Sequence, residues 1–238
     1  MNLLDKIDEE INDNTYPLVI GLTGGGGKTT TLIELGKYYR EKGKKVLLTT
    51  TTKIQAPRFF DFGVNHVFVE ESKFFHHNPK NGESVVYVEN HIMNAKKAVA
   101  PRLELFSHIV NMYDVIVIEA DGARCLPCKI HSDRDPVIVD EITSIIAMVG
   151  LSSYNDMAAN VCMGENSTEK VNIQYYQKLI DNKEGLLKGI DENKHKAIIL
   201  FNQSDLIDDS VVPSLYELKS AVPILVGSVK NKDIFIKK

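Results

Sequence analysis

The feature that most constrains this chain is a run of four glycines: Gly24, Gly25, Gly26 and Gly27. Apolar residues 18–22 precede the run, and residues 29–41 follow it with helix-forming side chains at helical spacing. Glycine adopts positive φ and lets the backbone approach a ligand closely. Successive backbone N–H groups and a helix N-terminus can then face one anion. The pattern therefore predicts a strand, a phosphate-binding loop for a nucleoside triphosphate, and a helix.

The residues directly after the glycines have the charge and the hydroxyl that such a loop needs. Lys28 would lie at the β- and γ-phosphates, the Thr29 hydroxyl would bind Mg²⁺, and Thr30 would complete the nucleotide-binding set. Leu22 stands where this motif usually has a glycine, and Gly21 lies one residue earlier. The T-G-x-x-G-K-T-T loops of Mur-type ligases show a similar shift. A flexible glycine linker is the alternative, and the flanking strand and helix patterns disfavour it.

Apolar runs alternate with helical patterns along the chain. Strands are expected at residues 18–22, 46–48, 67–69, 85–88, 115–118, 145–149, 197–201 and 224–226, and helices at 1–15, 29–41, 102–112, 168–180 and 213–221. Continuous apolar runs are typical of strands buried on both faces of a parallel sheet. The sequence thus predicts a three-layer α/β fold of the P-loop NTPase type with a mostly parallel sheet. Residues 1–238 are expected to form a single nucleotide-binding domain, with a small irregular excursion at 53–100.

Composition argues against several other classes of protein. The chain has 28 lysines and arginines against 32 aspartates and glutamates, a net charge of -4, so nothing suggests the basic face that nucleic-acid binding needs. Its three cysteines are too few for a disulfide framework. We see no apolar run long enough to span a membrane and no secretory signal at the acidic N-terminus. A soluble cytoplasmic protein is expected.

Two acidic residues follow the apolar run 115–118. Glu119 and Asp121 alternate along an extended chain, and ligands of parallel α/β sheets bind beyond the carboxyl ends of the strands. One of them could hold a Mg²⁺-bound water and the other could orient an attacking water. Together with Lys28 they are the candidate catalytic residues, and with Thr29 the candidate metal ligands. A solvated polar turn is the alternative.

A second polar loop follows the apolar run 197–201. Its sequence, Asn202-Gln203-Ser204-Asp205, resembles the N-K-x-D loop of GTP-binding proteins, in which the aspartate binds guanine and the asparagine braces the loop. Gln203 replaces the lysine that normally packs on the base. Asn202 and Asp205 are therefore candidate nucleotide-binding residues, and both ATP and GTP stay open. An ordinary polar turn is an equal alternative.

Three basic residues are expected near the same edge of the sheet: Lys53, Arg124 and Lys129. They could bind an anionic substrate or stabilise charge in phosphoryl transfer. The threonines at 49–52, just before Lys53, could contact the γ-phosphate through a hydroxyl, although threonine also favours strands.

Cysteine and histidine give weaker signals. Cys125 and Cys128 could form half of a metal site or a redox pair. Ordinary thiols are favoured, because the further candidate ligands Cys162 and His131 have no supporting spacing. The pair at 76–77, His-His, is expected to be exposed in an irregular segment.

Taken in order, these segments resemble the selenium-dependent hydroxylase accessory proteins (YqeC-like). The resemblance rests on the T-T-T-T-K-I and E-A-D-G-A-R motifs and on blocks at residues 24–31, 46–57, 119–129, 135–138, 149–151, 184–189 and 202–205. This sequence departs from the family pattern at Cys125 and Cys128. The resemblance implies a P-loop nucleotide-binding protein associated with maturing selenium-containing molybdenum hydroxylases.

The expected function is therefore that of a Mg²⁺-dependent ATPase or GTPase acting as an accessory factor for those hydroxylases. Its partners would be a nucleoside triphosphate and a molybdenum hydroxylase or its cofactor. Two alternatives stay open. One is an ATP-dependent ligase or kinase acting on a small anionic substrate, and the other is a non-catalytic nucleotide switch that docks on a partner enzyme.

Overall fold

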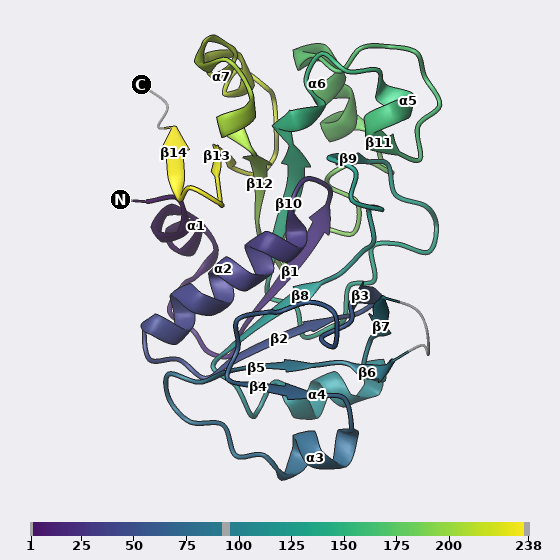
Figure 1. The fold of residues 1–238 in the computed structure, drawn as a ribbon. Helices are drawn as coiled ribbons and strands as arrows, with labels where there is room; N and C mark the ends of the chain where they lie inside the picture. The colour runs from purple at the N-terminus through teal and green to yellow at the C-terminus, as the bar shows by residue number, and fades with distance from the viewer. Residues whose placement is uncertain (1, 92–95, 236–238) are drawn as a thin grey trace.

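A computed structural model describes residues 2–91 and 96–235, and its centre is a nine-stranded sheet (Figure 1). In the order in which they lie side by side, its strands are β14 (Asp233–Phe235), β13 (Ile224–Ser228), β12 (Lys196–Asn202), β10 (Ser144–Gly150), β1 (Leu18–Gly24), β8 (Val115–Glu119), β2 (Val46–Thr50), β5 (Ser84–Tyr87) and β4 (His66–Phe68). All neighbouring strands are parallel except β13 and β14. The mostly parallel sheet is thus confirmed.

Helices cover both faces of the sheet. One face carries α1 (Leu3–Ile11) and α2 (Lys28–Glu41), and the other carries α3 (Glu71–His76), α4 (Phe106–Ile109), α5 (Ala158–Val161), α6 (Ile173–Asp181) and α7 (Val212–Leu215). Alternate residues of a strand point to opposite faces. In β8, Val115 and Val117 pack with α1 and α2, whereas Ile116 and Ile118 pack with the opposite layer. Two apolar cores therefore sandwich the sheet, as the three-layer prediction requires.

The glycine run lies at the carboxyl end of the central strand. β1 pairs with β8 on one side and with β10 on the other, and α2 begins at Lys28, directly after the glycines. The register places Leu22 opposite Glu119 and Gly24 opposite Met148. The topology thus brings the loop and the acidic end of β8 to the same edge of the sheet.

Residues 53–100 divide between two sheets. β4 and β5, joined by α3, extend the main sheet as parallel strands. A separate antiparallel sheet is formed by β3 (Lys53–Gln55), β7 (Lys97–Val99) and β6 (Glu89–His91). The sequence suggests only β4 and β5, because the short strands of the antiparallel sheet lack a continuous apolar run. The expectation for the two histidines is also only half right: His76 ends α3 and is exposed, but His77 is half-buried.

The carboxyl-terminal half differs from expectation mainly at element ends. The helix expected at 168–180 begins later, because the Asn172 side chain accepts a hydrogen bond from the Tyr175 N–H (2.9 Å) and caps α6. The helical pattern at 213–221 yields only α7 and neighbouring turns. A two-stranded sheet pairs β9 (Cys128–Lys129) with β11 (Cys162–Met163). In the described part of the chain, every helix is too short or too polar to cross a membrane.

Candidate nucleotide-binding site

The glycine run is required because the neighbouring backbone leaves no room for side chains. A Cβ on Gly24 would lie 2.3 Å from the Met148 carbonyl oxygen, and one on Gly26 would lie 2.1 Å from the Gly150 nitrogen. Gly24, Gly26 and Gly27 also have positive φ. The loop is therefore seated directly on the carboxyl end of β10.

Only the second half of the run faces the pocket. The Gly24 N–H donates to Asp121 Oδ2 (2.9 Å), the Gly25 N–H to a carbonyl oxygen of β10 (2.9 Å), and the Gly26 N–H to the Leu126 carbonyl oxygen (3.2 Å). These three N–H groups already donate to acceptors within the protein. Fewer glycine N–H groups are therefore available to an anion than the sequence predicts. The donors that remain for an anion are those of the first turn of α2, which lack an intrahelical acceptor.

Lys28, the first residue of α2, is 5% exposed. Its Nζ donates to the Gly24 carbonyl oxygen and lies 3.0 Å from Asp121 Oδ1. The loop lysine and the acid of the middle strand, which the sequence predicts separately, thus form one buried ion pair beneath the pocket.

Asp121 is fully buried among donors. Its Oδ2 lies 2.7 Å from His131 Nε2 and 3.2 Å from Lys129 Nζ. Burial opposes ionisation, but the Lys28 charge and the His131 hydrogen bond hold the pKa of Asp121 well below its ordinary value. Asp121 does not line the pocket, so in the structure it is an anchor for the loop and its lysine.

Lys129, which the sequence offers as a candidate for binding an anionic substrate, does not line the pocket either. Its side chain is fully buried, and Nζ donates to the Gly122 carbonyl oxygen (2.6 Å) and pairs with Asp121 and Asp135. A buried ammonium must be neutralised locally. Lys129 therefore forms ion pairs with these two carboxylates inside the protein. The pair with Asp135 forms only because the fold brings the two side chains together.

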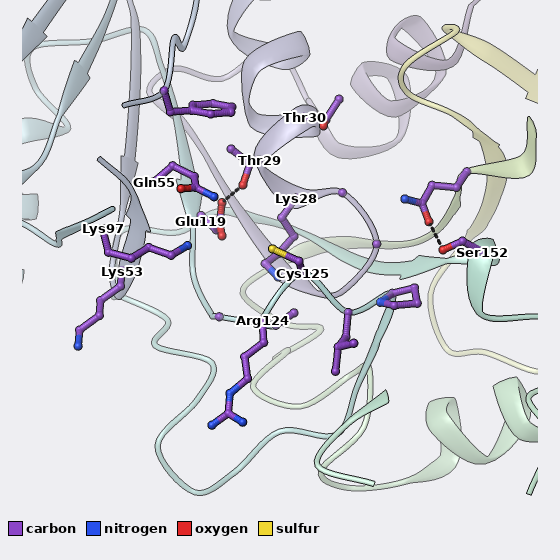
Figure 2. A pocket seen from close by; sticks show the side chains of 18 residues that line it. Lys28, Thr29, Thr30, Lys53, Gln55, Lys97, Glu119, Arg124, Cys125 and Ser152 are labelled. Atoms are coloured by element: carbon purple, nitrogen blue, oxygen red, sulfur yellow. Dashed lines mark hydrogen bonds between the residues drawn. The ribbon is translucent and has the colours of Figure 1, made fainter. Parts of the chain in front are cut away.

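Glu119 and Thr29 meet at the pocket wall. The Thr29 hydroxyl donates to Glu119 Oε2 at 2.9 Å (Figure 2). Glu119 is 8% exposed, and burial raises the pKa of its carboxyl, which Lys28 and Thr29 only partly oppose. The structure thus brings together the hydroxyl and the carboxylate that were predicted as metal ligands.

The pocket has a volume of about 360 Å³ and opens beside the loop (Figure 2). Among the predicted site residues, it is lined by Gly26, Gly27, Lys28, Thr29, Thr30, Lys53, Glu119 and Arg124. Sequence reasoning missed Lys97, which lies on β7 and faces the same space as Lys53 on β3. No local signal could indicate this position, because it depends on the antiparallel pairing of two three-residue strands. The three cations Lys53, Lys97 and Arg124 give the pocket a basic wall.

The second polar loop touches the site through its first two residues. The Asn202 amide donates to the Gly26 carbonyl oxygen (2.8 Å) and accepts from the Val229 N–H (2.9 Å), so it braces the glycine loop. Gln203 lines the pocket and accepts a hydrogen bond from Ser152. Asp205 is exposed and does not line the pocket.

The threonine hydroxyls before Lys53 are used inside the protein. Thr49, Thr50 and Thr51 each donate to a backbone carbonyl oxygen at 2.7 Å. They hold the carboxyl ends of neighbouring segments together and leave Lys53 as the residue of this stretch that reaches the pocket.

The two cysteines of the C-x-x-C pair lie in different environments. Cys125 is exposed and lines the pocket, whereas Cys128 is buried in β9 opposite Cys162 of β11. Burial raises the pKa of Cys128 to about 12 and that of Cys162 to about 11. These two thiols are therefore protonated at neutral pH.

Sequence comparison places the chain among known proteins. Residues 20–165 match the model of the YqeC protein family. The chain belongs to the YqeC family. The uncharacterized protein YqeC of Escherichia coli (strain K12) is 30% identical over 139 residues, which are 56% of this chain and 52% of that protein. The match thus spans about half the length of this curated YqeC relative.

Two solved structures are similar to this YqeC family member. The signal recognition particle receptor FtsY from Elizabethkingia anophelis, solved in complex with GDP, superimposes with a TM-score of 0.50 at 14% identity, covering 99% of this chain and 66% of that one. FtsY from Mycoplasma mycoides gives a TM-score of 0.48 at 14% identity, covering 96% and 65%. The first of these likenesses confirms the predicted P-loop NTPase-like fold.

Proposed function

We propose that this YqeC family member binds a Mg²⁺–nucleoside triphosphate in the pocket beside the glycine loop and hydrolyses it. The observation that carries the proposal is the buried Lys28 at the start of α2, next to a cavity of about 360 Å³. The helix N-terminus and the ammonium supply positive charge at one point, which is what a polyphosphate requires. The likeness to the GDP complex of FtsY supports a nucleotide as the ligand.

The residues at the pocket wall fit a magnesium ion. Mg²⁺ prefers oxygen ligands and commonly binds through one or two protein groups together with the phosphates. Thr29 Oγ1 and Glu119 Oε2, 2.9 Å apart, are such a pair, and we assign the metal to them. Asp121 then keeps Lys28 in place. When bound, Mg²⁺ would neutralise charge on the phosphates during phosphoryl transfer.

The three cations of the basic wall would contact the phosphates in addition to Lys28 and the metal. Lys53 on β3, Lys97 on β7 and Arg124 in the loop after β8 line the pocket from three different segments. Positive charge fixed in place before the reaction stabilises charge that develops during phosphoryl transfer. The same three cations support a second candidate, a kinase or ligase that transfers to a small anionic acceptor.

We propose, on the family resemblance, that this activity serves the maturation of selenium-dependent molybdenum hydroxylases. The partner would be such a hydroxylase or its cofactor. A nucleotide switch that docks on the hydroxylase without turnover is the third candidate, and it predicts nucleotide-dependent binding of the partner with slow hydrolysis.

Calorimetry with ATP and GTP, with and without Mg²⁺, tests nucleotide binding. Lys28→Ala is expected to lower the affinity for the preferred triphosphate by about 10- to 100-fold, because hydrogen bonds to charged groups contribute about 1.5–3 kcal/mol. Lys37→Ala is the matched control, since this lysine lies on the same helix and pairs with Glu34 outside the pocket. Equal affinity of the wild type and Lys28→Ala would exclude the proposed site.

Product analysis in the same panel separates the candidate reactions. Free phosphate that needs no second substrate supports hydrolysis, whereas a phosphorylated or adenylated small molecule supports the kinase or ligase. Asp205→Asn tests base choice: if the loop at 202–205 binds guanine, this variant loses affinity for GTP and keeps its affinity for ATP.

A further inference from the structure

A second cluster of potential ligands lies at the edge of the main sheet opposite the nucleotide pocket. His66 begins β4, His77 follows the last residue of α3, and Glu83 directly precedes β5. β4 and β5 are parallel, so both begin at the amino edge, and α3 between them returns the chain to that edge. One strand–helix–strand unit therefore gathers three side chains far from the glycine loop, which lies at the carboxyl edge.

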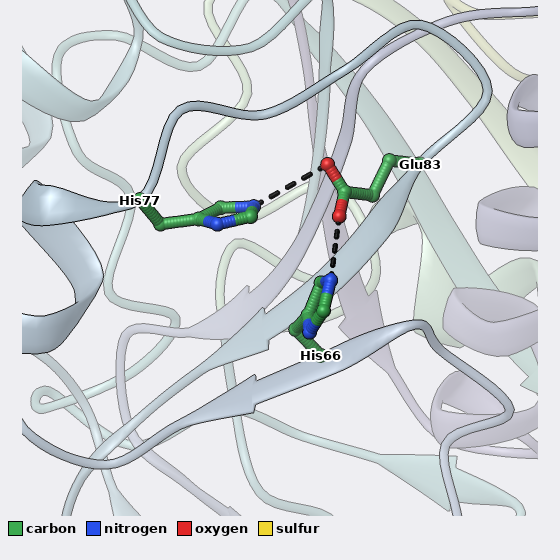
Figure 3. A group of neighbouring side chains, drawn as sticks. All are labelled: His66, His77 and Glu83. Carbon is green, nitrogen blue, oxygen red and sulfur yellow. Dashed lines mark ion pairs between the residues drawn. The ribbon is translucent and has the colours of Figure 1, made fainter.

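The carboxylate of Glu83 lies between the two imidazole rings (Figure 3). His66 Nε2 is 2.7 Å from Glu83 Oε1, and His77 Nε2 is 3.3 Å from Glu83 Oε2. The three ligand atoms all lie within 4.8 Å of one another. Two imidazole nitrogens and a carboxylate oxygen thus converge on one small volume.

The His77 contact is not a satisfactory hydrogen bond. Its Nε2 is shielded from solvent and has no hydrogen-bond partner in the described part of the chain, although it faces the carboxylate. A buried polar atom without a partner costs free energy. A hydrogen bond within the described residues therefore does not explain why this nitrogen faces Glu83.

The surrounding structure fixes the orientation of these side chains. The Lys80 N–H donates to Glu83 Oε2 at 2.7 Å and positions the carboxylate. The His77 ring packs on the Phe68 ring, with centroids 5.0 Å apart, and lies 5.0 Å from the His66 ring. Groups that orient ligands in this way are typical of metal sites.

We propose that His66, His77 and Glu83 bind one divalent transition-metal ion of the zinc type. Zinc takes imidazole nitrogen and carboxylate oxygen at about 2.0–2.2 Å, and sites with three protein ligands leave a fourth position to water. The ion would tie β4, α3 and the turn before β5 together at the sheet edge, independently of nucleotide.

Titration of the 238-residue chain with Zn²⁺ alone, followed by calorimetry, tests this site. The wild type should bind one ion, and the double variant His66→Ala/His77→Ala should lose that binding. Removing a group that only orients a metal ligand costs about 10- to 100-fold in affinity, so Glu83→Gln, which removes a ligand charge, should weaken binding at least as much. His76→Ala is the matched control, because this neighbouring histidine is exposed and outside the cluster.

Substitution by Co²⁺ gives a second readout. A nitrogen and oxygen ligand set should produce visible ligand-field bands without the thiolate charge-transfer band that binding at a cysteine would cause. Zn²⁺ should also raise the unfolding temperature of the wild type and not that of the double variant, whose folding is checked by circular dichroism and by nucleotide affinity. Unchanged Zn²⁺ binding in the double variant, or no binding by the wild type, would overturn the proposal.

Discussion

Asp121 shows how a single residue can organise a charged site. Its carboxylate holds the Gly24 amide and the buried cations Lys28 and Lys129. Asp121→Asn keeps the size of the side chain but leaves two buried ammonium groups undercompensated. Removing one partner of a buried pair typically costs about 3–5 kcal/mol, so the free energy of unfolding should fall by about that amount at pH 7, measured by urea denaturation.

The pH dependence of that difference follows from the lowered pKa of Asp121. The folded-state value lies below the ordinary value of about 3.9, so the stabilisation is complete well above that pH and decreases as the pH falls toward the folded-state pKa. The wild type should therefore exceed Asp121→Asn by more at pH 7 than at about pH 3.5. A difference that does not change with pH would contradict this account.

A comparison of substitutions at Gly26 and Gly43 distinguishes the cost of backbone strain from the cost of a steric clash. Both have positive φ, 78° and 76°, but a Cβ would meet the Gly150 nitrogen at 2.1 Å in the first case and nothing within 4 Å in the second. Gly43→Ala should cost only the strain of the left-handed conformation, roughly 1–2 kcal/mol. Gly26→Ala should cost clearly more in urea denaturation and also weaken nucleotide binding. Equal costs would show that the loop can move away from β10.

At the scale of elements, α3 packs against the sheet through the aromatic contacts of Phe74. Phe74 is fully buried and stacks on Tyr87 of β5, with ring centroids 4.0 Å apart and planes at 8°. Phe74→Ala should lower the free energy of unfolding by about 3–5 kcal/mol. Phe59→Ala, at a side chain that is 57% exposed, should change it by no more than about 0.5 kcal/mol. Urea denaturation of both variants measures the contrast.

The same scale separates what the sequence predicts from what it does not. The long buried strands β1, β8, β10 and β12 and the helix α2 were predicted because their apolar runs and the glycine–lysine junction act locally. The basic wall at Lys97 was missed because it arises from the pairing of β3 with β7, which no local pattern encodes. The burial of Lys129 is not evident from the sequence because it depends on carboxylates that only the fold brings together.

At the scale of the whole molecule, ligand binding should raise the free energy of unfolding. A ligand that binds only the folded state, at about 100 times its dissociation constant, adds about 2.7 kcal/mol. For a chain of 238 residues this corresponds to a rise of about 5–10 °C in the unfolding temperature. The rise should require a Mg²⁺–triphosphate and should be clearly smaller in Lys28→Ala at the same ligand concentration, because the weaker affinity lowers the stabilisation; thermal scans measure the difference. An equal rise in that variant would place the ligand elsewhere.

The contact between Lys28 and Asp121 has one more consequence, for exchange of the ligand. Without a ligand the ammonium already has an internal counter-ion, so release of a nucleotide leaves no bare charge in a dry interior. An incoming phosphate has to share that cation with the carboxylate, and its net attraction is smaller than that of an unpaired lysine. Such an arrangement moderates capture of a nucleotide and eases its departure, as the proposed cycle of binding and hydrolysis would require.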